Sequence, residues 1–331
     1  MEIIYYKIDL VDNWDYYLSF FKNGDFDVYF EEKYVKLYES DVDKAACFVC
    51  NFEDKYLLFP FLRNDIIHEG ERFYEIKSPY GYGGPISNVQ DAQFVETAME
   101  HFFFYCENNN YITCFIRLHP LLGNHRCFNQ VYSCKYNRKT VAIDLQPSVD
   151  DIWMHQISTK NRNVLRHTFK DNFRFIADYD YFFIDDFIRL YMHTMDRKES
   201  DSFYHFSKSY FYKFKKQFKD SFLAVVIYNE VIVSASIIFY STDYGHYHLS
   251  AWDLNYSPLN SNKFLIWEVA KFLKSLNVKL FHLGGGTDSN IDNSLFKFKK
   301  KFSKNKYDFY ICNMTFKNTL NDSFRVGINS K

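Results

Sequence analysis

The chain contains few of the residues that interrupt regular secondary structure. Of its 331 residues, 11 are glycine and 6 are proline, while 47 % are hydrophobic. This composition supplies enough apolar side chains for packed cores, which excludes an intrinsically disordered chain. A chain of this length suits two domains of ordinary size.

An excess of charge of either sign is also lacking. Lysine and arginine together number 40, and aspartate and glutamate number 41. Because no overall field attracts nucleic acid or an anionic membrane, we expect no DNA partner, and any contact with RNA has to be local. The sequence shows neither an apolar run as long as a membrane span nor a secretory signal peptide. We therefore expect a cytoplasmic protein without a transmembrane segment.

The cysteines do not follow the spacing of a metal site. Of the 7 cysteines, only Cys47 and Cys50 have CxxC spacing, and they fall in the apolar, strand-like run AACFVC. Residues three apart on a strand point to opposite faces, and no second pair of ligands accompanies this one. We expect reduced thiols and no bound metal.

The stretch from His246 to Phe302 carries the clearest pattern in the chain. Apolar residues recur at helical spacing between two strand-like segments, HYHLSA and VKLFHL, which predicts a β-α-β unit. The second strand ends in Gly284, Gly285 and Gly286. Glycines at the carboxyl end of a strand let the backbone approach a ligand closely, at the edge where open α/β sheets bind substrates. We expect the functional site there, although a glycine triplet alone is an ordinary turn signal.

A hairpin precedes this unit, because SFLAVVIY and VIVSASIIFY read as two strands joined by a turn at Asn229 and Glu230. In the strand that follows, His246 and His248 lie two residues apart and therefore on one face. With His282 they would form a set of metal ligands. The alternative, which we favour, is ordinary hydrogen-bonded histidines, with His248 as the group that accepts a proton from an attacking amine.

These segments resemble one family. The run FHLGGG, a short helix with FKKKF, and the preceding HYHLSA and NKFLIWEVAKF are similar to the acetyltransferase-like (GNAT) domain of the FemABX group, and SPYGYGGPI at 78–86 is similar to that group's first domain. The resemblance implies an α/β (α+β) fold of two tandem GNAT-like domains, each a mixed sheet flanked by helices. It places an acceptor-binding domain at 1–146 and a catalytic domain at 147–316, with a tail, 317–331, that packs back on the first domain. In that group a lysine after the glycine triplet is associated with the reacting carbonyl, and the match here is Lys299.

Tyr80 and Tyr82 lie in the glycine-rich segment of the first domain. The glycines around them cannot hold a regular element, so a shaped loop is expected. The two tyrosines either pack this loop or reach a ligand by stacking and hydrogen bonding. The resemblance favours a ligand, because the corresponding region lines the acceptor cleft in that group.

Two expected helices complete the predicted acceptor site. The first covers 150–170, and its arginines belong either to a solvated basic face or to a phosphate-binding site. The second covers 185–211, and the resemblance implies that its tyrosines and arginine face the cleft. The predicted acceptor-binding residues on these helices are Arg162, Arg166, Tyr191, Arg197 and Tyr204.

The segment before the helix of the β-α-β unit, YSPLNSNKF, lacks glycine altogether. GNAT enzymes that use coenzyme A present a glycine-rich loop there, whose backbone N–H groups hold a pyrophosphate. Here Lys263 is available for one phosphate, while Pro258 removes a donor. FemABX proteins that use aminoacyl-tRNA also lack this loop, so we expect aminoacyl-tRNA rather than acyl-CoA as the donor substrate, and no bound cofactor. Basic strips at 160–170 and 297–304 would contact an acceptor stem.

The expected activity is amide formation on an amino group. No Ser-His-Asp or Cys-His arrangement is legible, which favours direct attack of the amine on the acyl group. We expect an acyltransferase or aminoacyltransferase that acts on a nucleotide-linked amino sugar or another cell-wall precursor. The alternatives are an acetyl-CoA-dependent N-acetyltransferase of a nucleotide amino sugar and a non-catalytic sugar-nucleotide-binding protein.

Overall fold

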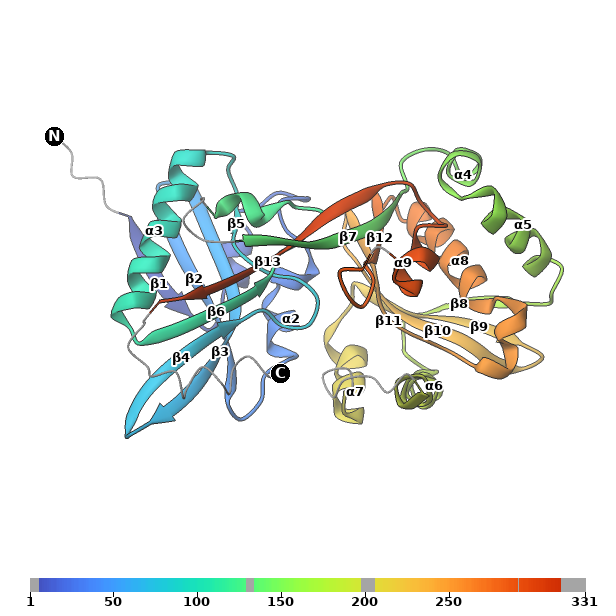
Figure 1. Ribbon diagram of the computed structural model, residues 1–331, viewed down its shortest axis with the longest axis horizontal. Helices are drawn as coiled ribbons and strands as arrows, with labels where there is room; N and C mark the ends of the chain where they lie inside the picture. Colours follow the sequence, from blue (N-terminus) through green and yellow to red (C-terminus); the bar gives the residue numbers. More distant parts are fainter. Residues whose placement is uncertain (1–5, 129–133, 198–205, 291, 317–331) are drawn as a thin grey trace. The chain divides into compact units, whose positions relative to one another are not determined.

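The computed structural model describes residues 6–128, 134–197, 206–290 and 292–316. The chain folds into two compact units, which Figure 1 shows coloured along the sequence. Unit 1 consists of Met1–Asn137 and Asp308–Lys331, and unit 2 consists of Arg138–Tyr307. The chain therefore enters unit 2 once and returns to unit 1 once.

Unit 1 is built on a mixed sheet in the order β1-β2-β3-β4-β6-β13, with β5 paired to β3. Neighbouring strands are antiparallel except β4 and β6, which are parallel. Strands β2 and β3 pair as an antiparallel hairpin whose turn lies at Glu53 and Asp54. The elements are β1 (Lys7–Val11), α1 (Asp15–Leu18), η1 (Val28–Phe30), α2 (Glu32–Lys36), β2 (Asp43–Phe52), β3 (Lys55–His68), β4 (Glu71–Lys77), β5 (Ile86–Ser87), α3 (Ala92–Asn108), β6 (Tyr111–Arg117), η2 (Asn124–Cys127) and most of β13 (Lys306–Thr315).

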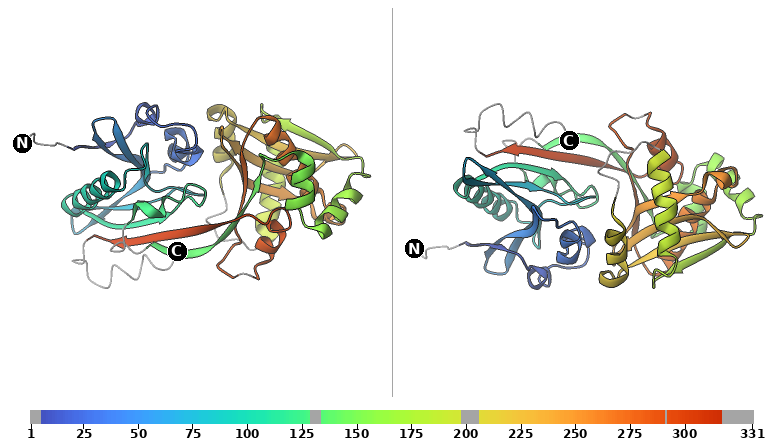
Figure 2. Two further views of the ribbon diagram at one scale, coloured as in Figure 1. Left: turned by 90° about the horizontal axis from the view of Figure 1, so that it is seen from above. Right: turned by 90° about the horizontal axis from the view of Figure 1, so that it is seen from below.

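The long helix α3 covers one face of this sheet (Figures 1 and 2). The Asp91 carboxylate accepts the Phe94 N–H and caps the start of the helix. Phe94 and Phe102 on its apolar side are buried in one core with Phe48 and Phe59 from the sheet. Burying each such ring stabilises the unit by about 1.5–3 kcal/mol relative to leaving it exposed.

The strands of unit 2 lie in the order β7-β12-β11-β10-β9-β8. Only β11 and β12 are parallel; the other neighbours are antiparallel. The elements are β7 (Cys134–Asp144), α4 (Val149–Asp151), the π-helix η3 (Ile152–Gln156), α5 (Thr159–Thr168), β8 (Arg174–Asp178), α6 (Ile184–Arg197), α7 (Lys208–Gln217), β9 (Ser221–Tyr228), β10 (Val231–Tyr240), β11 (Tyr244–Trp252), η5 (Leu254–Leu259), α8 (Ser261–Ser275), β12 (Leu280–Gly284) and α9 (Ser294–Lys299).

The predicted β-α-β unit is confirmed as β11, α8 and β12. Helix α8 buries Leu265, Val269 and Leu273 on one face of the sheet, and these residues share a core with Phe281 of β12. Helices α6 and α7 lie over the opposite face (Figure 2). The hairpin of β9 and β10 also forms where the sequence places it.

Strands β7 and β13 each contain a point where the chain passes between the units. The sequence predicts the first domain boundary after residue 146, and the compact units divide after residue 137. It predicts the end of the second domain at residue 316, and unit 2 ends at residue 307. The difference arises because each crossing falls inside a strand, where no glycine- or proline-rich linker marks it. The tail 317–331 lies outside the described residues.

Two helices expected from the sequence are interrupted. Within 150–170, η3 ends at Ile157, whose backbone is extended, and the Ser158 hydroxyl accepts the Asn161 N–H to start α5. Within 185–211, α6 ends and α7 begins after a cap at Ser207. The apolar periodicity continues through both places, while serine stabilises a new helix start at each.

The described residues include no helix that is both long and apolar enough to cross a membrane. All 7 cysteines are free thiols. Cys47 and Cys50 are buried in β2, and burial raises the pKa of Cys50 to about 12, so neither is a ready thiolate.

Candidate functional site

The glycine triplet forms the loop that leaves the carboxyl end of β12. Gly284 has a φ of 77°, which favours glycine. A Cβ on Gly285 would lie 3.0 Å from the Lys139 backbone oxygen, and one on Gly286 would lie 2.7 Å from Asn293. Glycines are therefore needed here because the loop packs closely against β7 and against the start of α9.

Lys299 is held against this loop. Lys299 is 8 % exposed, and its ammonium donates a hydrogen bond to the Gly285 carbonyl oxygen at 2.9 Å. The Arg138 guanidinium donates to the next carbonyl, that of Gly286, at 2.7 Å. Asn293 caps α9 by accepting the Phe296 N–H, and so fixes the helix that carries the lysine. The structure thus brings together four of the predicted residues and adds Arg138 and Asn293, which the sequence did not single out.

The chemistry open to a lysine ammonium in this place follows from its burial and its charge. A partly desolvated cation stabilises negative charge that develops on a nearby oxygen more strongly than it would in water. The hydrogen bond to a backbone carbonyl fixes its direction without neutralising its charge. An ammonium of this kind can stabilise an oxyanion on a substrate that binds beside it.

His248 lies at an irregularity of β11. Ile237 pairs with Leu249 and Ile238 pairs with Tyr247, so His248 is the extra residue of a β-bulge. Its Nε2 lies 3.3 Å from the Tyr210 hydroxyl oxygen, and burial followed by the nearby His246 lowers its pKa to about 3. The ring is therefore neutral at neutral pH and is a weak base.

His246 and His282 face each other across the parallel pair β11 and β12. They occupy paired register positions, and their ring centres are 5.5 Å apart. Both are buried. The structure thus places His282 beside His246, as the sequence suggested, whereas His248 packs with Tyr210 and Phe239.

Positive charge gathers at the start of α8. The residue before the helix, Asn260, has a φ of 57° and makes no side-chain cap; its Oδ1 instead accepts the Lys263 ammonium at 2.7 Å. Burial, and then the charges of Lys301 and Lys160, lower the pKa of Lys263. An anion bound at this position would relieve the repulsion and meet the positive end of the helix dipole.

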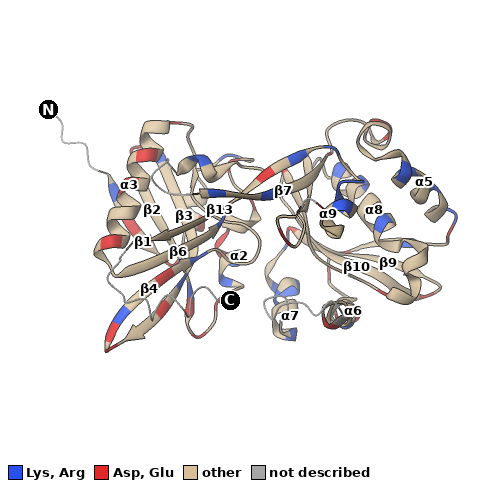
Figure 3. Cartoon of the chain, in the orientation of Figure 1, with Lys and Arg blue, Asp and Glu red and all other residues tan. Residues whose placement is uncertain are grey.

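The arginines of α5 have different environments. The Arg162 guanidinium donates to the backbone oxygens of Met154 and Ile157, both at 2.8 Å, and so stabilises the end of η3. Arg166 donates to the Asn163 side chain and lies 5.8 Å from the centre of the Trp153 ring. Figure 3 shows the basic residues along α5. Arg162 is therefore committed to local structure, whereas Arg166 remains at the surface.

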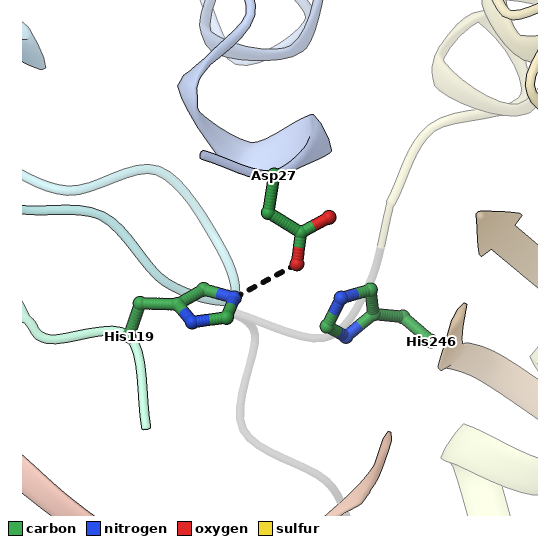
Figure 4. A group of neighbouring side chains, drawn as sticks. All are labelled: Asp27, His119 and His246. Atoms are coloured by element: carbon green, nitrogen blue, oxygen red, sulfur yellow. Dashed lines mark hydrogen bonds and ion pairs between the residues drawn. The ribbon is translucent and has the colours of Figure 1, made fainter. Parts of the chain in front are cut away.

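The tyrosines of the glycine-rich loop belong to unit 1. The ring of Tyr80 lies beside Tyr38, with 6.5 Å between centres. Tyr82 packs edge-on against Tyr29 and His119. Both tyrosines are half-buried. His119 in turn forms a buried pair with Asp27, 2.9 Å apart (Figure 4), which no sequence motif indicated.

The remaining predicted residues lie on α6 and beyond it. Tyr191 is 1 % exposed and packs against Phe187 and Phe211, so it contributes to the core between α6 and α7. Arg197 is the last residue of α6. Tyr204 lies outside the described residues.

Comparison with known proteins adds the family context. Residues 156–300 match the family model for an acetyltransferase (GNAT) domain. No curated protein matches the chain in sequence.

Many solved structures are similar to the chain, among them the following three. FemX is 11 % identical with a TM-score of 0.70, covering 98 % of this chain and 100 % of its own. The C-terminal domain (DUF2156) of a putative lysylphosphatidylglycerol synthetase from Agrobacterium fabrum is 13 % identical with a TM-score of 0.52, covering 86 % and 88 %. A tandem GNAT protein from the clavulanic acid biosynthesis pathway is 6 % identical with a TM-score of 0.51, covering 95 % and 100 %.

These likenesses confirm the predicted fold of two tandem GNAT-like domains. The matched family model contains β11, α8 and β12 together with the glycine triplet and Lys299, and it indicates an acyltransferase. Residues 156–300 are thus similar to an acetyltransferase (GNAT) domain, and the fold of the whole chain is similar to that of FemX.

Proposed function

We propose that the protein transfers an acyl or aminoacyl group to an amino group at the loop Gly284–Gly286. The observation that carries this proposal is the Lys299 ammonium, which is buried and held 2.9 Å from the Gly285 carbonyl oxygen. A cation directed at the carboxyl edge of two parallel strands suits a reaction whose transition state gains negative charge on oxygen.

The proposed reaction is direct attack. The neutral amine adds to the carbonyl carbon of an ester, the C–N bond forms, and Lys299 stabilises the oxyanion. The tetrahedral intermediate then collapses, and the bond between the carbonyl carbon and the ribose oxygen of the donor breaks. The ribose oxygen leaves and takes up the proton that the amine releases. His248, whose pKa is about 3, is too weak a base to hold that proton, so the amine has to arrive unprotonated.

Aminoacyl-tRNA is the proposed donor. The charges of Lys301 and Lys160 act on Lys263 and lower its pKa after burial does, which places three cations near one another at the start of α8. Arg166 and Trp153 add a cation and an aromatic ring on the neighbouring α5. Phosphates and unpaired bases bind to such combinations of cations and rings. The start of α8 lacks glycine, as in FemABX proteins that use aminoacyl-tRNA.

The proposed acceptor is a nucleotide-linked amino sugar or another cell-envelope precursor. Support comes from the resemblance of residues 78–86 to the acceptor region of the FemABX group, and from the half-buried rings of Tyr80 and Tyr82 on that loop. Tyrosines of this kind stack on a base or sugar and donate a hydrogen bond.

The test is a comparison of donors. The protein is incubated with UDP-glucosamine and either charged tRNA or acetyl-CoA, and the products are analysed by mass spectrometry. We expect an aminoacylated sugar nucleotide with charged tRNA and none with uncharged tRNA. Turnover with acetyl-CoA alone identifies an N-acetyltransferase and contradicts the donor. Binding of the sugar nucleotide without turnover by either donor favours a non-catalytic binding protein.

A further inference from the structure

The glycine loop of unit 1, residues 78–85, is fixed on one side by the end of β6. The Gly83 N–H donates to the Arg117 oxygen at 2.8 Å. The Asn124 side-chain nitrogen donates to the oxygens of Gly83 and Pro85 at 2.9 and 3.1 Å. Three hydrogen bonds thus hold the second half of the loop.

On its other side the loop contacts η1 and α2. The Tyr34 hydroxyl donates to the Tyr80 backbone oxygen at 2.6 Å. Gly81 has a φ of 92°, and a Cβ added there would lie 2.5 Å from a ring carbon of Tyr29. The position of η1, which carries Tyr29, therefore determines the path of the loop.

A buried pair, Asp27 and His119, joins these two sides (Figure 4). Asp27 precedes η1; its Oδ1 accepts the Val28 N–H at 2.7 Å, and its Oδ2 lies 2.9 Å from His119 Nε2. His119 follows β6, and its backbone N–H donates to the Asn124 side-chain oxygen at 2.8 Å. Asp27 is 0 % exposed and His119 is 1 % exposed. Asn124 therefore contacts both the loop and one member of the pair.

The hydrogen bonds assign the histidine tautomer. His119 Nδ1 accepts the Leu122 N–H at 3.2 Å, so the ring proton lies on Nε2 and is donated to Asp27. Asp27 supplies two acceptors, one for Val28 and one for His119. An asparagine offers only one acceptor, so Asp27→Asn turns an amide N–H₂ toward one of the two donors. The substitution keeps the shape of the side chain and breaks its hydrogen bonding.

We propose that Asp27 and His119 are positioning residues for acceptor binding. They hold η1 against the end of β6, so that the glycine loop presents Tyr80 and Tyr82 in one conformation. This inference rests on the proposed function, in which the loop contacts the acceptor. The ring centres of Tyr82 and His119 are 5.4 Å apart, so the pair also supports one of these tyrosines directly. A preformed loop loses less conformational entropy on binding, so disturbing the pair weakens binding and leaves the chemical step unchanged.

Hydrogen–deuterium exchange measures the loop directly. In Asp27→Asn and in His119→Phe we expect peptides covering 78–85 to exchange about tenfold faster, while peptides from α8 are unchanged. His119→Gln keeps a donor for the Asp27 carboxylate and should restore part of the protection. Unchanged exchange of the loop in Asp27→Asn and His119→Phe overturns the proposal.

Acceptor kinetics separate positioning from a purely structural role. With UDP-glucosamine as the probe, Asp27→Asn should raise KM about tenfold and change kcat less than about twofold. The matched control is Asp65→Asn, which weakens partly exposed ion pairs with Arg63 and Arg72 in the same unit and should change neither value. Faster exchange with an unchanged KM overturns the positioning role. Failure of the proposed function gives a different result. In that case the wild-type protein neither binds nor acylates UDP-linked amino sugars, whatever the exchange rates of the loop are, and the acceptor role of the pair is contradicted as well.

Discussion

Replacing Lys299 with alanine removes the ammonium that lies 2.9 Å from the Gly285 carbonyl oxygen and leaves the glycine triplet in place. Loss of one preorganised donor to an oxyanion costs about 10²–10³ in kcat, or about 2.7–4 kcal/mol of transition-state stabilisation. The same change removes a hydrogen bond from a charged group, which lowers the free energy of unfolding by about 1.5–3 kcal/mol. The folded variant should therefore bind the acceptor normally and turn over at about 0.1–1 % of the wild-type rate.

Lys297 provides the matched control. It lies on the same helix, two residues earlier, where its half-exposed ammonium pairs with Asp292 at 2.8 Å. A surface ion pair of this kind contributes about 0–1 kcal/mol to stability, so Lys297→Ala should keep the melting temperature and, at saturating tRNA, the rate of the chemical step. The assay is single-turnover kinetics at saturating acceptor, with melting curves for both variants. A folded Lys299→Ala enzyme with an undiminished rate, or an equal loss in Lys297→Ala, refutes the reasoning.

Three further predictions concern other parts of the protein. Tyr80→Ala and Tyr82→Ala should weaken binding of UDP-glucosamine, measured by calorimetry, more than they lower kcat, because binding common to the ground and transition states affects KM first; unchanged affinity in both would make the loop structural. The pKa of His248 is about 3 in the folded protein and 6.5 ordinarily, so the unfolded state takes up a proton first as the pH falls, and the free energy of unfolding should drop by about 1.4 kcal/mol per pH unit between 6.5 and 3. Melting curves of His248→Gln should show a flatter dependence on pH, and a dependence equal to that of the wild type would contradict this prediction. Lys263→Ala and Lys301→Ala should each weaken tRNA binding and reduce its salt dependence by about one unit of slope, measured by filter binding between low and high salt, and an unaltered slope would place the phosphates elsewhere.

The parts of the fold predicted correctly are those with strong local patterns. The hairpin of β9 and β10 has an apolar run on each side of Asn229 and Glu230, which both adopt positive φ. The β-α-β unit shows helical periodicity between two short strands. By contrast, β1 is mostly exposed along its length, so it shows no alternation that predicts a strand. The break before α5 depends on one serine cap in a continuous apolar pattern.

The residues of the candidate site also fall into those that a local pattern predicts and those that it does not. The glycine triplet and Lys299 lie within 16 residues of one another in the sequence, so one motif includes them all. Arg138 donates to Gly286 across 148 residues, and Asp27 meets His119 across 92. Such pairs have no spacing that a single sequence can reveal, because tertiary packing alone brings them together. Arg162 shows that residue type alone is also insufficient. An arginine on this helix suggested either a solvated basic face or a phosphate-binding site, and in the fold its guanidinium donates hydrogen bonds to the backbone oxygens of Met154 and Ile157.

The path of the chain through its two units also sets the order in which they can be completed during synthesis. Strand β6 pairs with β13 through residues 311–315, and β13 leaves the ribosome about 200 residues after β6. At about 5–20 residues per second, β6 is an unpaired edge for roughly 10–40 s, while all of unit 2 is translated. An exposed edge strand of this kind invites pairing with other chains. The nascent protein is therefore most prone to aggregate before β13 emerges, and unit 2, although it follows in sequence, is the first of the two to be complete.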